Sequence, residues 1–288
     1  MDWINGHFPR YRGALAVHRN QREILLAASG NKQILLVPRG GVGSIEHYYH
    51  FVFDLLLPLY RLKRNAPSNV EFMIEEFGVL TPLLEQVLPE GMKIVAHREA
   101  MKVATKASLF GMNPHGVHLS KREITRFKKA IFNTLEIKPP NLRGKVVLFV
   151  ERLPSDLYFL ESAKIKGSGA DRRSIPNHQE LFDLLKTSLA GSYEVVNIQP
   201  EQLDFKVQVS CFAQAHAVIA QHGAALANTI WMKPGSKVIE LNNDLDLSHF
   251  KTISQIAGHR YRVFKTDHEH APVDPVSFSH WLSQKGGL

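Results

Sequence analysis

The chain has 288 residues, 44% of them hydrophobic and 22% charged, which is an ordinary composition for a globular protein. No apolar run reaches the roughly 18 residues needed to span a bilayer, and the single cysteine, Cys211, excludes an internal disulfide framework and a multi-cysteine zinc site. The 35 Lys and Arg residues outnumber the 27 Asp and Glu residues, which favours a polyanionic partner. The sequence contains neither basic tracts interleaved with aromatic residues nor paired Cys/His fingers, so nucleic acid is not expected to be that partner.

Short strand and helix patterns make up the first half of the chain. The expected elements are strands at 14–26 and 33–37, a helix at 45–62 after the turn RGGVGS, a strand at 70–76, a helix at 81–89, strands at 93–97 and 106–112, and a helix at 120–136. The paired prolines of EIKPPNLRGK favour a linker near 136–145. We therefore expect an N-terminal α/β domain over residues 1–140 and a second domain over 141–288.

The second half alternates strands and helices regularly. The expected strands are 146–151, 193–198, 215–220, 237–241 and 261–264, and the expected helices are 177–189, 201–214, 224–232, 248–258 and 275–284. This alternation predicts βαβ crossovers and a parallel sheet, so the C-terminal domain is expected to be Rossmann-like. Two α/β domains enclose a cleft, and ligands of parallel sheets bind beyond the carboxyl ends of the strands.

A histidine and three small residues follow the strand at 215–220. His222 lies just past the end of that strand, and Gly223, Ala224 and Ala225 open the next helix with almost no side-chain bulk. A helix N-terminus attracts anions, so a phosphate can approach this backbone and accept a hydrogen bond from His222. Small residues equally suit close packing of helix on strand, and both interpretations stay open.

Four further polar residues are expected at the same edge of the sheet. Glu240 ends the next strand, where an acid suits a ribose diol, although a solvated strand end is the alternative. Arg152 and Arg173 precede the first helix of the second domain, and guanidinium groups suit bidentate recognition of phosphate. Asn177 is a further candidate for phosphate binding, although Asn177-x-x-Glu180 is also a capping-box pattern.

The apolar helix of the first domain carries polar residues on one face. His47, His50, Asp54 and Arg61 are spaced by three, four and seven residues, and Pro58 is expected to kink or end the helix. Such groups are costly to bury unless they are paired or used. Three alternatives stay open: a structural network, a general base formed by His50 and oriented by Asp54, and a metal site formed by His47, His50 and Asp54.

Four pieces of the sequence resemble glycosyltransferase family 61, whose members include capsular polysaccharide enzymes, plant β-xylosyltransferases and animal O-linked GlcNAc transferases. The pieces are HYYHFVFDLLLPLYRL, VVLFVER, RRSIPNHQEL and QHGAALANTIWMKPGSKVIEL. The last piece is the most specific, with a His-Gly-Ala-small-Leu-x-Asn block before Pro-Gly-Ser and a strand that ends in Glu. The resemblance covers roughly residues 40–288, and His178 and Ala225 depart from the Glu and Gly that are common in the family.

The resemblance implies a GT-B fold, in which two Rossmann-like domains face a central cleft and the C-terminal one binds the nucleotide sugar. It also implies inversion at the anomeric carbon, a donor that is expected to be UDP-linked, and no metal or other cofactor. Glu240 would hold the ribose, and His50 with Asp54 would supply the base. The groups expected at the pyrophosphate are Arg152, Arg173, Asn177, His222 and the amides of Gly223 and Ala224, with His47 and Asn228 as secondary candidates.

These expectations describe an inverting glycosyltransferase of bacterial surface polysaccharide synthesis that acts on a glycan or lipid-linked glycan. A cytoplasmic location is expected because the N-terminal residues lack an apolar signal core, and the basic surface suits peripheral association with an anionic membrane. The oligomeric state is left open. Two alternatives remain: a metal-dependent hydrolase built on His47, His50 and Asp54, and a non-catalytic partner that binds a nucleotide sugar.

Overall fold

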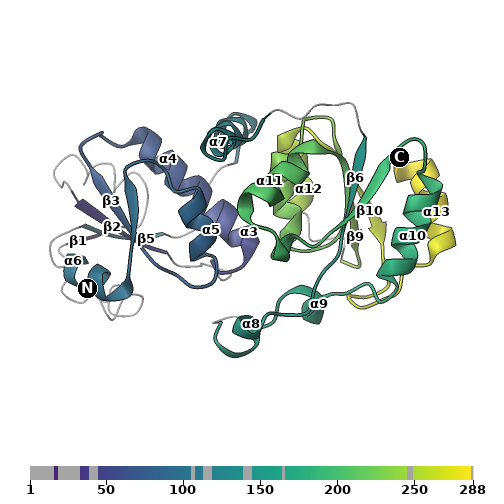
Figure 1. The fold of residues 1–288 in the computed structure, drawn as a ribbon, viewed down its shortest axis with the longest axis horizontal. Helices are drawn as coiled ribbons and strands as arrows, with labels where there is room; N and C mark the ends of the chain where they lie inside the picture. The colour runs from purple at the N-terminus through teal and green to yellow at the C-terminus, as the bar shows by residue number, and fades with distance from the viewer. Residues whose placement is uncertain are drawn as a thin grey trace. The chain divides into compact units, whose positions relative to one another are not determined.

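Each half of the chain folds around its own parallel β-sheet in the computed structural model (Figure 1). The structure describes residues 16–18, 33–38, 45–104, 108–112, 119–138, 145–163, 166–244, 249–286 and 288. The internal contacts divide the chain into two units, Met1–His118 (unit 1) and Leu119–Leu288 (unit 2). The expected turn at 39–44 and the centre of the expected linker, 139–144, lie outside the described residues.

The sheet of unit 1 has five parallel strands in the spatial order β1-β5-β2-β3-β4. Counted from β2 as the first strand, the order β4-β3-β2-β5 is the 3-2-1-4 order of a Rossmann sheet. Of the strand expected at 14–26, only 16–18 are described. The elements are β1 (Ala16–His18), β2 (Gln33–Pro38), α3 (Tyr48–His50), η2 (Phe51–Leu56), α4 (Leu57–Asn65), β3 (Glu71–Glu75), α5 (Thr81–Gln86), β4 (Met92–Val95), α6 (His97–Ala104) and β5 (Ser108–Met112).

The expected apolar helix of unit 1 runs through α3, η2 and α4 without interruption. Its middle part, η2, is a π-helix in which the N–H of Leu57 donates to the carbonyl of Val52. Pro58 follows directly and has no N–H to donate, and in a regular α-helix its ring would crowd the carbonyl four residues earlier, that of Asp54. The wider π-turn accommodates that proline, and the helix continues to Asn65. Of the two expected effects of Pro58, a kink or an end of the helix, the end is therefore wrong.

The sheet of unit 2 also has five parallel strands, in the order β10-β9-β8-β6-β7. Counted from β6, this is the doubly wound order 2-1-3-4-5, and the chain reverses direction across the sheet between β6 and β8. The strands are β6 (Val146–Val150), β7 (Glu194–Ile198), β8 (Ala215–Gln221), β9 (Lys237–Asn242) and β10 (Arg260–Lys265). The helices are α7 (Lys121–Thr134), α8 (Leu157–Glu161), α9 (Gly169–Arg172), α10 (His178–Ser188), η3 (Pro200–Gln202), α11 (Phe205–Gln214), η4 (Ala224–Trp231), α12 (His249–Ala257), α13 (Pro275–Trp281) and η5 (Leu282–Gly286).

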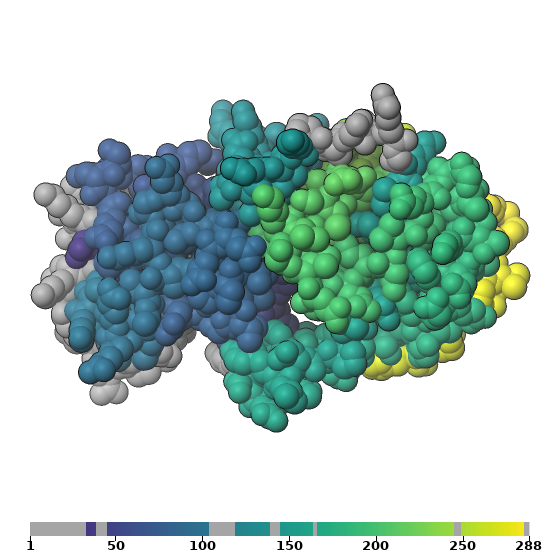
Figure 2. All heavy atoms as spheres, viewed as in Figure 1, coloured from purple at the N-terminus to yellow at the C-terminus, as the bar shows by residue number. Residues whose placement is uncertain are grey.

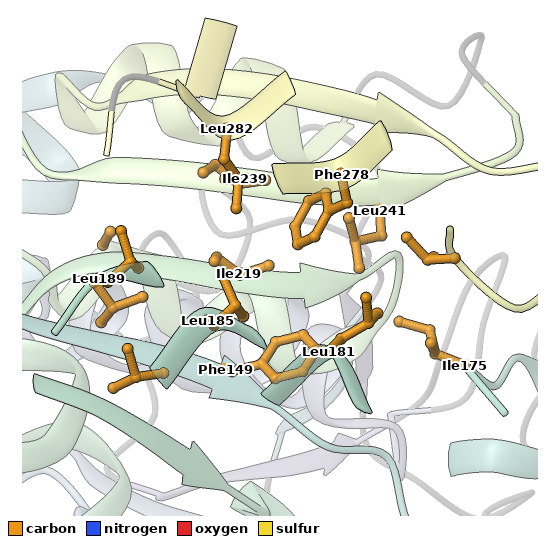
Figure 3. Close-up of a cluster of buried hydrophobic side chains, with 14 residues drawn as sticks. Phe149, Ile175, Leu181, Leu185, Leu189, Ile219, Ile239, Leu241, Phe278 and Leu282 are labelled. Carbon is orange, nitrogen blue, oxygen red and sulfur yellow. The ribbon is translucent and has the colours of Figure 1, made fainter. Parts of the chain in front are cut away.

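One face of this sheet carries a hydrophobic core (Figure 3). Phe149, Ile219 and Ile239 project from β6, β8 and β9 and are fully buried. They pack with Leu181 of α10 and Phe278 of α13, which are also fully buried. Burial of each such side chain contributes about 2 kcal/mol. The core therefore holds the ends of β6, β8 and β9 in a fixed register, which places the polar residues beyond them.

Helix α7 belongs to unit 2. Ser120 caps its start by accepting a hydrogen bond from the backbone N–H of Glu123 at 3.2 Å. The ring of Phe127 lies 5.4 Å from that of Trp231 in η4, and Lys128 Nζ donates to the carbonyl of Met232 at 2.5 Å. Because of this packing, the division between the units falls at 118/119, whereas the sequence analysis placed it at 140/141.

Residues 153–163 and 166–172, between β6 and α10, carry the short helices α8 and α9, which the sequence did not predict. Figures 1 and 2 show the part around α8 standing out from the body of unit 2. Leu157 and Leu160 on α8 are 68% and 49% exposed. Among the helices that the structure describes, none combines the length and apolar character required to cross a membrane.

The predicted fold class, α/β of the GT-B type with two Rossmann-like domains, is confirmed by the two parallel sheets and their strand orders. One local difference concerns the helix expected at 224–232. It forms as η4, which is a 3₁₀-helix rather than an α-helix.

Candidate functional site

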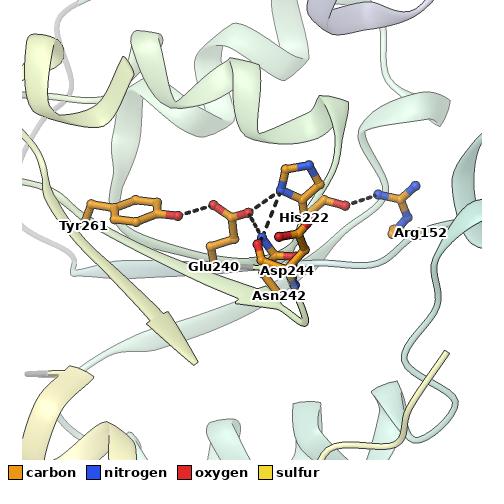
Figure 4. A network of polar contacts seen from close by, with 6 residues as sticks. All are labelled: Arg152, His222, Glu240, Asn242, Asp244 and Tyr261. Carbon is orange, nitrogen blue, oxygen red and sulfur yellow. Dashed lines mark hydrogen bonds and ion pairs between the residues drawn. The ribbon is translucent and has the colours of Figure 1, made fainter. Parts of the chain in front are cut away.

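The candidate site lies beyond the carboxyl ends of β6, β8 and β9 in unit 2 (Figure 4). Arg152 comes two residues after β6, and His222 and Gly223 come directly after β8. Glu240 lies near the end of β9. The structure thus brings together at one sheet edge the residues that the sequence analysis placed there. Tyr261 of β10 joins them, and the sequence analysis did not single it out.

His222 is held by Glu240. Its Nδ1 lies within hydrogen-bonding distance of Glu240 Oε1, and because a carboxylate only accepts, Nδ1 carries the proton. Asn242 Nδ2 donates to the same carboxylate oxygen at 3.2 Å. The rings of His249 and Phe250 lie 5.1 and 5.2 Å from the His222 ring. These contacts fix the orientation of the imidazole, so its Nε2 is the nitrogen left to act on a ligand.

Glu240 is completely buried, and both of its carboxylate oxygens are engaged. Oε2 accepts a hydrogen bond from the hydroxyl of Tyr261 at 2.5 Å. Burial, and then the bond to Glu240, raises the pKa of Tyr261 far above its ordinary value, so the phenol stays protonated and donates. The expectation that Glu240 holds a ribose does not fit this placement, because its oxygens are used within the protein. Glu240 instead positions His222.

Arg152 joins two parts of the chain. Its Nη1 donates to the carbonyl of His222 at 3.0 Å, while Nε and Nη2 donate to the carbonyl of Gly169 at 3.1 and 2.6 Å. One N–H on each terminal nitrogen remains. Burial lowers the pKa of Arg152 to about 10, so the group is still charged at neutral pH. Arg152 therefore braces the start of α9 against the end of β8 while keeping donors for a ligand.

Gly223 is required by this arrangement. A Cβ at this position would lie 1.8 Å from Arg152 Nη1 and 3.0 Å from its Cζ. Its backbone is extended, so the reason for glycine is the close approach of the guanidinium rather than an unusual dihedral angle. Glycine is also required at position 169. The φ of Gly169 is +49°, and a Cβ added there would lie 2.0 Å from the carbonyl oxygen of Leu153.

Arg173 is half-buried at the end of α9. Its buried Nε has no hydrogen-bond acceptor among the described residues. Burial, and then the nearby Arg172, lowers its pKa, while Glu269, Asp244 and Glu240 act in the opposite direction. Within the described part of the chain, neither Arg152 nor Arg173 forms an ion pair with a carboxylate. A half-buried guanidinium that forms no ion pair with a carboxylate favours an anionic ligand.

Two other sequence candidates are occupied by structural roles. Asn177 is the N-cap residue of α10 but donates from Nδ2 to Glu180 Oε2 and to the carbonyl of Val273, at 2.9 and 2.8 Å, and accepts from the N–H of Val273 at 2.9 Å. Asn228 is fully buried in η4, where its Oδ1 accepts from Trp231 Nε1 at 3.0 Å. These placements do not bring either amide to a phosphate. Ala224, by contrast, begins η4 directly beside His222 and Gly223.

A pocket of about 250 Å³ opens between the ends of β6 and β8, where the chain reverses across the sheet. Ligands of doubly wound sheets bind at such a switch point. Gln221, the last residue of β8, forms part of the wall by donating from Nε2 to the carbonyls of Ser174 and Glu269 at 3.1 and 2.9 Å. The lining residues are Val150, Glu151, Arg152, Ser174, Ile175, Pro176, His178, Gln179 and Gln221.

Unit 1 contains the expected pair of His50 and Asp54. His50 Nδ1 lies 2.5 Å from Asp54 Oδ2, and the two side chains are 24% and 13% exposed. Asp54 thus holds the proton on Nδ1 and leaves Nε2 as a basic nitrogen. Burial, and then the charge of Asp54, raises the pKa of Tyr49. His47 precedes this pair as the N-cap residue of α3, and its carbonyl accepts from the N–H of Phe51 at 3.0 Å.

A second histidine–carboxylate pair in unit 1 was missed by the sequence analysis. His97 Nδ1 is hydrogen-bonded to Glu75, which is buried at the end of β3, and the N–H of His97 donates to Glu76 Oε1 at 3.0 Å. The expected strand at 70–76 ends with Glu75 and Glu76, and the expected strand at 93–97 ends with His97. Acids and a histidine at the ends of two strands were the available signal for this pair. In the described residues, no group of three or more His, Cys, Asp and Glu side chains is placed to hold a metal ion.

Comparison with known proteins adds the following relationships. Residues 48–239 match the model of the family Glycosyltransferase 61. The chain is similar to the EGF domain-specific O-linked N-acetylglucosamine transferase of Gallus gallus, with 28% identity over 116 residues that cover 38% of this chain and 22% of that protein. The protein of the same name from Drosophila melanogaster is 27% identical over 93 residues, which cover 32% of this chain and 18% of that protein.

The match therefore spans about a fifth of the length of these curated relatives. Among solved structures, the E. coli heptosyltransferase WaaC with ADP aligns over 88% of this chain and 98% of that chain, with a TM-score of 0.42 and 11% sequence identity.

Proposed function

Because the chain belongs to glycosyltransferase family 61, we propose that it transfers a sugar from a nucleotide-sugar donor to a hydroxyl group of a glycan. One observation of the structure carries this proposal. Two half-buried arginines, Arg152 and Arg173, lie at the carboxyl edge of the sheet of unit 2 without a carboxylate partner among the described residues. A diphosphate supplies the missing negative charge.

The leaving diphosphate is stabilised by groups that surround this edge. Arg173 and the remaining N–H groups of Arg152 donate to it, as do the backbone amides of Gly223 and Ala224 at the start of η4. Nε2 of His222 donates to the same oxygens when the imidazole is protonated, because Glu240 already binds Nδ1. These donors perform the function that a metal ion performs in metal-dependent transferases, and we propose that transfer is metal-independent.

The acceptor is activated by His50. Its Nε2 takes the proton of the acceptor hydroxyl as the oxygen attacks the anomeric carbon, and Asp54 supports the imidazolium that forms. The bond between the anomeric carbon and the phosphate oxygen breaks, and the nucleoside diphosphate leaves. A single displacement of this kind inverts the anomeric configuration.

The donor is proposed to be UDP-linked and the acceptor a glycan or lipid-linked glycan in bacterial surface polysaccharide synthesis, at the cytoplasmic face of a membrane. The relatives named above are N-acetylglucosamine transferases, so UDP-N-acetylglucosamine is the first donor to test. The net charge of +8 supports association with an anionic surface or acceptor.

Calorimetric titration with UDP, CMP and GDP in the presence of EDTA tests this function. We expect one nucleotide to bind without metal, and Arg173→Ala to weaken it about ten-fold or more, as for loss of a charge-assisted hydrogen bond. Arg172→Ala is the matched control, because Arg172 is the exposed neighbour of Arg173. Absence of binding to all three nucleotides, or equal losses in the two variants, would contradict the proposed donor site.

A further inference from the structure

The pocket between β6 and β8 contains an acid that the sequence analysis did not select. Glu151 follows β6 directly and lines the pocket beside Arg152. Its Oε2 accepts hydrogen bonds from Asn197 Nδ2 and Gln199 Nε2 at 2.7 and 2.6 Å. Among the described residues, no donor is bonded to its Oε1. The carboxylate therefore has one oxygen anchored and one available.

The anchor of Glu151 is preorganised because one of its two partners, Asn197, is itself held in place. Asn197 lies in β7, and its Oδ1 accepts from His178 Nε2 at 3.0 Å, which sets the orientation of the amide and directs Nδ2 toward Glu151. The ring of His178 stacks on that of Phe149 with centroids 4.1 Å apart and an interplanar angle of 6°. Phe149 is fully buried in β6. Preorganisation of this kind reduces the entropy lost when a ligand binds.

Glu151 is held in its ionised form. Burial acts to raise its pKa, but the hydrogen bonds from Gln199 and Asn197 outweigh that effect, and the pKa lies below its ordinary value. An ionised carboxylate only accepts hydrogen bonds, so the ligand group facing Oε1 must be a donor. The neighbouring Arg152 provides the opposite charge in the same pocket, and it favours an anion.

We propose that Glu151 binds the ribose diol of the nucleotide, in the position that the sequence analysis assigned to Glu240. A nucleoside diphosphate carries vicinal hydroxyl donors at one end and phosphate oxygens at the other, which matches a carboxylate beside a guanidinium. Glu240 is excluded from this position because it is completely buried and both its oxygens are engaged. The proposal rests on the proposed function, since it concerns the same donor.

The decisive experiment compares a ribonucleotide with its deoxy counterpart. UDP, CDP, ADP and GDP are titrated calorimetrically into the full chain, and the tightest ligand is then compared with its 2′-deoxy form. We expect the deoxy form to bind wild type about ten-fold more weakly, and this ratio to fall close to one in Glu151→Gln. Glu194→Gln is the control, because Glu194 is exposed at the opposite end of a strand of the same sheet, and it should keep the wild-type ratio.

The outcomes separate this proposal from the proposed function. If none of the four diphosphates binds wild type, both the diol contact and the proposed release of a nucleoside diphosphate fail. If one binds but its deoxy form binds equally well, the donor site stands and the diol is not recognised. If wild type discriminates and Glu151→Gln discriminates to the same extent, the diol is bound by another residue. The comparison of the two ligands on wild type needs no variant, so a folding defect of Glu151→Gln does not prevent the test.

Discussion

Glu240, on β9, binds Nδ1 of His222 at the end of the neighbouring strand β8 and is itself completely buried. The carboxylate lies behind the imidazole, so it acts on a ligand only through His222. Tyr261, on the next strand β10, binds the second oxygen of the same carboxylate. Residues from three neighbouring strands thus form a chain of hydrogen bonds that ends at Nδ1 of His222. The role of the acid near the end of β9 is therefore to orient this histidine.

Substitution Glu240→Gln tests the positioning of His222. Loss of a buried acceptor charge should lower the free energy of unfolding by about 1–3 kcal/mol and allow both neutral tautomers of His222. Urea unfolding measures the first effect, and ¹⁵N chemical shifts of the labelled imidazole measure the second. The exposed Glu194→Gln should change neither. An unaltered ¹⁵N pattern for His222 in Glu240→Gln would show that the carboxylate does not set the tautomer.

Tyr261 should remain protonated in alkaline solution. Burial and the bond to Glu240 raise the pKa of its phenol, so in the folded protein it should not ionise below the alkaline unfolding transition. Absorbance titration should therefore show the same number of ionising tyrosines in wild type and in Tyr261→Phe. One fewer ionising tyrosine in the variant would contradict the prediction. Loss of the hydroxyl should also destabilise the fold by about 1–2 kcal/mol, since it leaves Oε2 of Glu240 short of a donor.

Gly223→Ala should disrupt the site by a clash with Arg152. The added methyl group would lie 1.8 Å from Nη1, and the guanidinium is fixed by its bonds to the carbonyls of His222 and Gly169. We expect a destabilisation of about 1–3 kcal/mol and a loss of nucleotide binding. Denaturant unfolding of both single variants and of Gly223→Ala/Arg152→Ala forms a double-mutant cycle. The double variant should lose less stability than the sum of the single ones, and strict additivity would refute the clash.

His50 should affect transfer without affecting donor binding. His50→Ala should lower the transfer rate by about 10²–10⁴-fold, as expected for loss of a general base. Asp54→Asn should lower it less, because the imidazole is kept but its proton is no longer fixed on Nδ1. The Kd for the nucleotide should be unchanged in both variants. His97→Ala is the comparison, since His97 is also paired with a carboxylate. A loss of rate in His97→Ala, with His50→Ala active, would assign the base to His97.

His259 should make unit 2 less stable in acid. Burial lowers its pKa to about 4 from an ordinary value of 6.5, so between these pH values the unfolded chain binds more protons than the folded one. Stability from this group is therefore present above pH 6.5 and is lost as the pH falls toward 4. We expect a loss of about 2 kcal/mol between pH 7.5 and pH 5, measured by urea unfolding.

His259→Gln isolates this contribution. The glutamine amide can donate to the carbonyl of Thr229, as Nε2 of His259 does at 2.9 Å, but it does not titrate. The free energy of unfolding of the variant should depend less on pH over this range. An equally steep dependence would assign the acid sensitivity to other groups.

Local sequence patterns were sufficient to predict the sheet of unit 2 and several of the polar residues at its edge. Short segments rich in apolar residues, separated by helical patterns, predicted the parallel sheet of unit 2, because strands buried on both faces are largely apolar. The same patterns placed Arg152, His222 and Glu240 at one edge, since the carboxyl ends of parallel strands coincide. The pairing of His50 with Asp54 followed from their helical spacing of four residues.

Tertiary structure decided which of the polar side chains are bonded within the protein and which line the pocket. Glu240 and Glu151 both lie near strand ends, but Glu240 meets Tyr261 only because β9 and β10 pair in one particular register, with Glu240 opposite Val263. Asn197 of β7 and Gln199 just after it bind Glu151 although they are more than forty residues away in sequence. Contacts of this range depend on how strands are ordered and aligned, and a local pattern contains no information about either. The sequence therefore determined where the polar edge lies, and the packing of strands determined that Glu240 is completely buried while Glu151 lines the pocket.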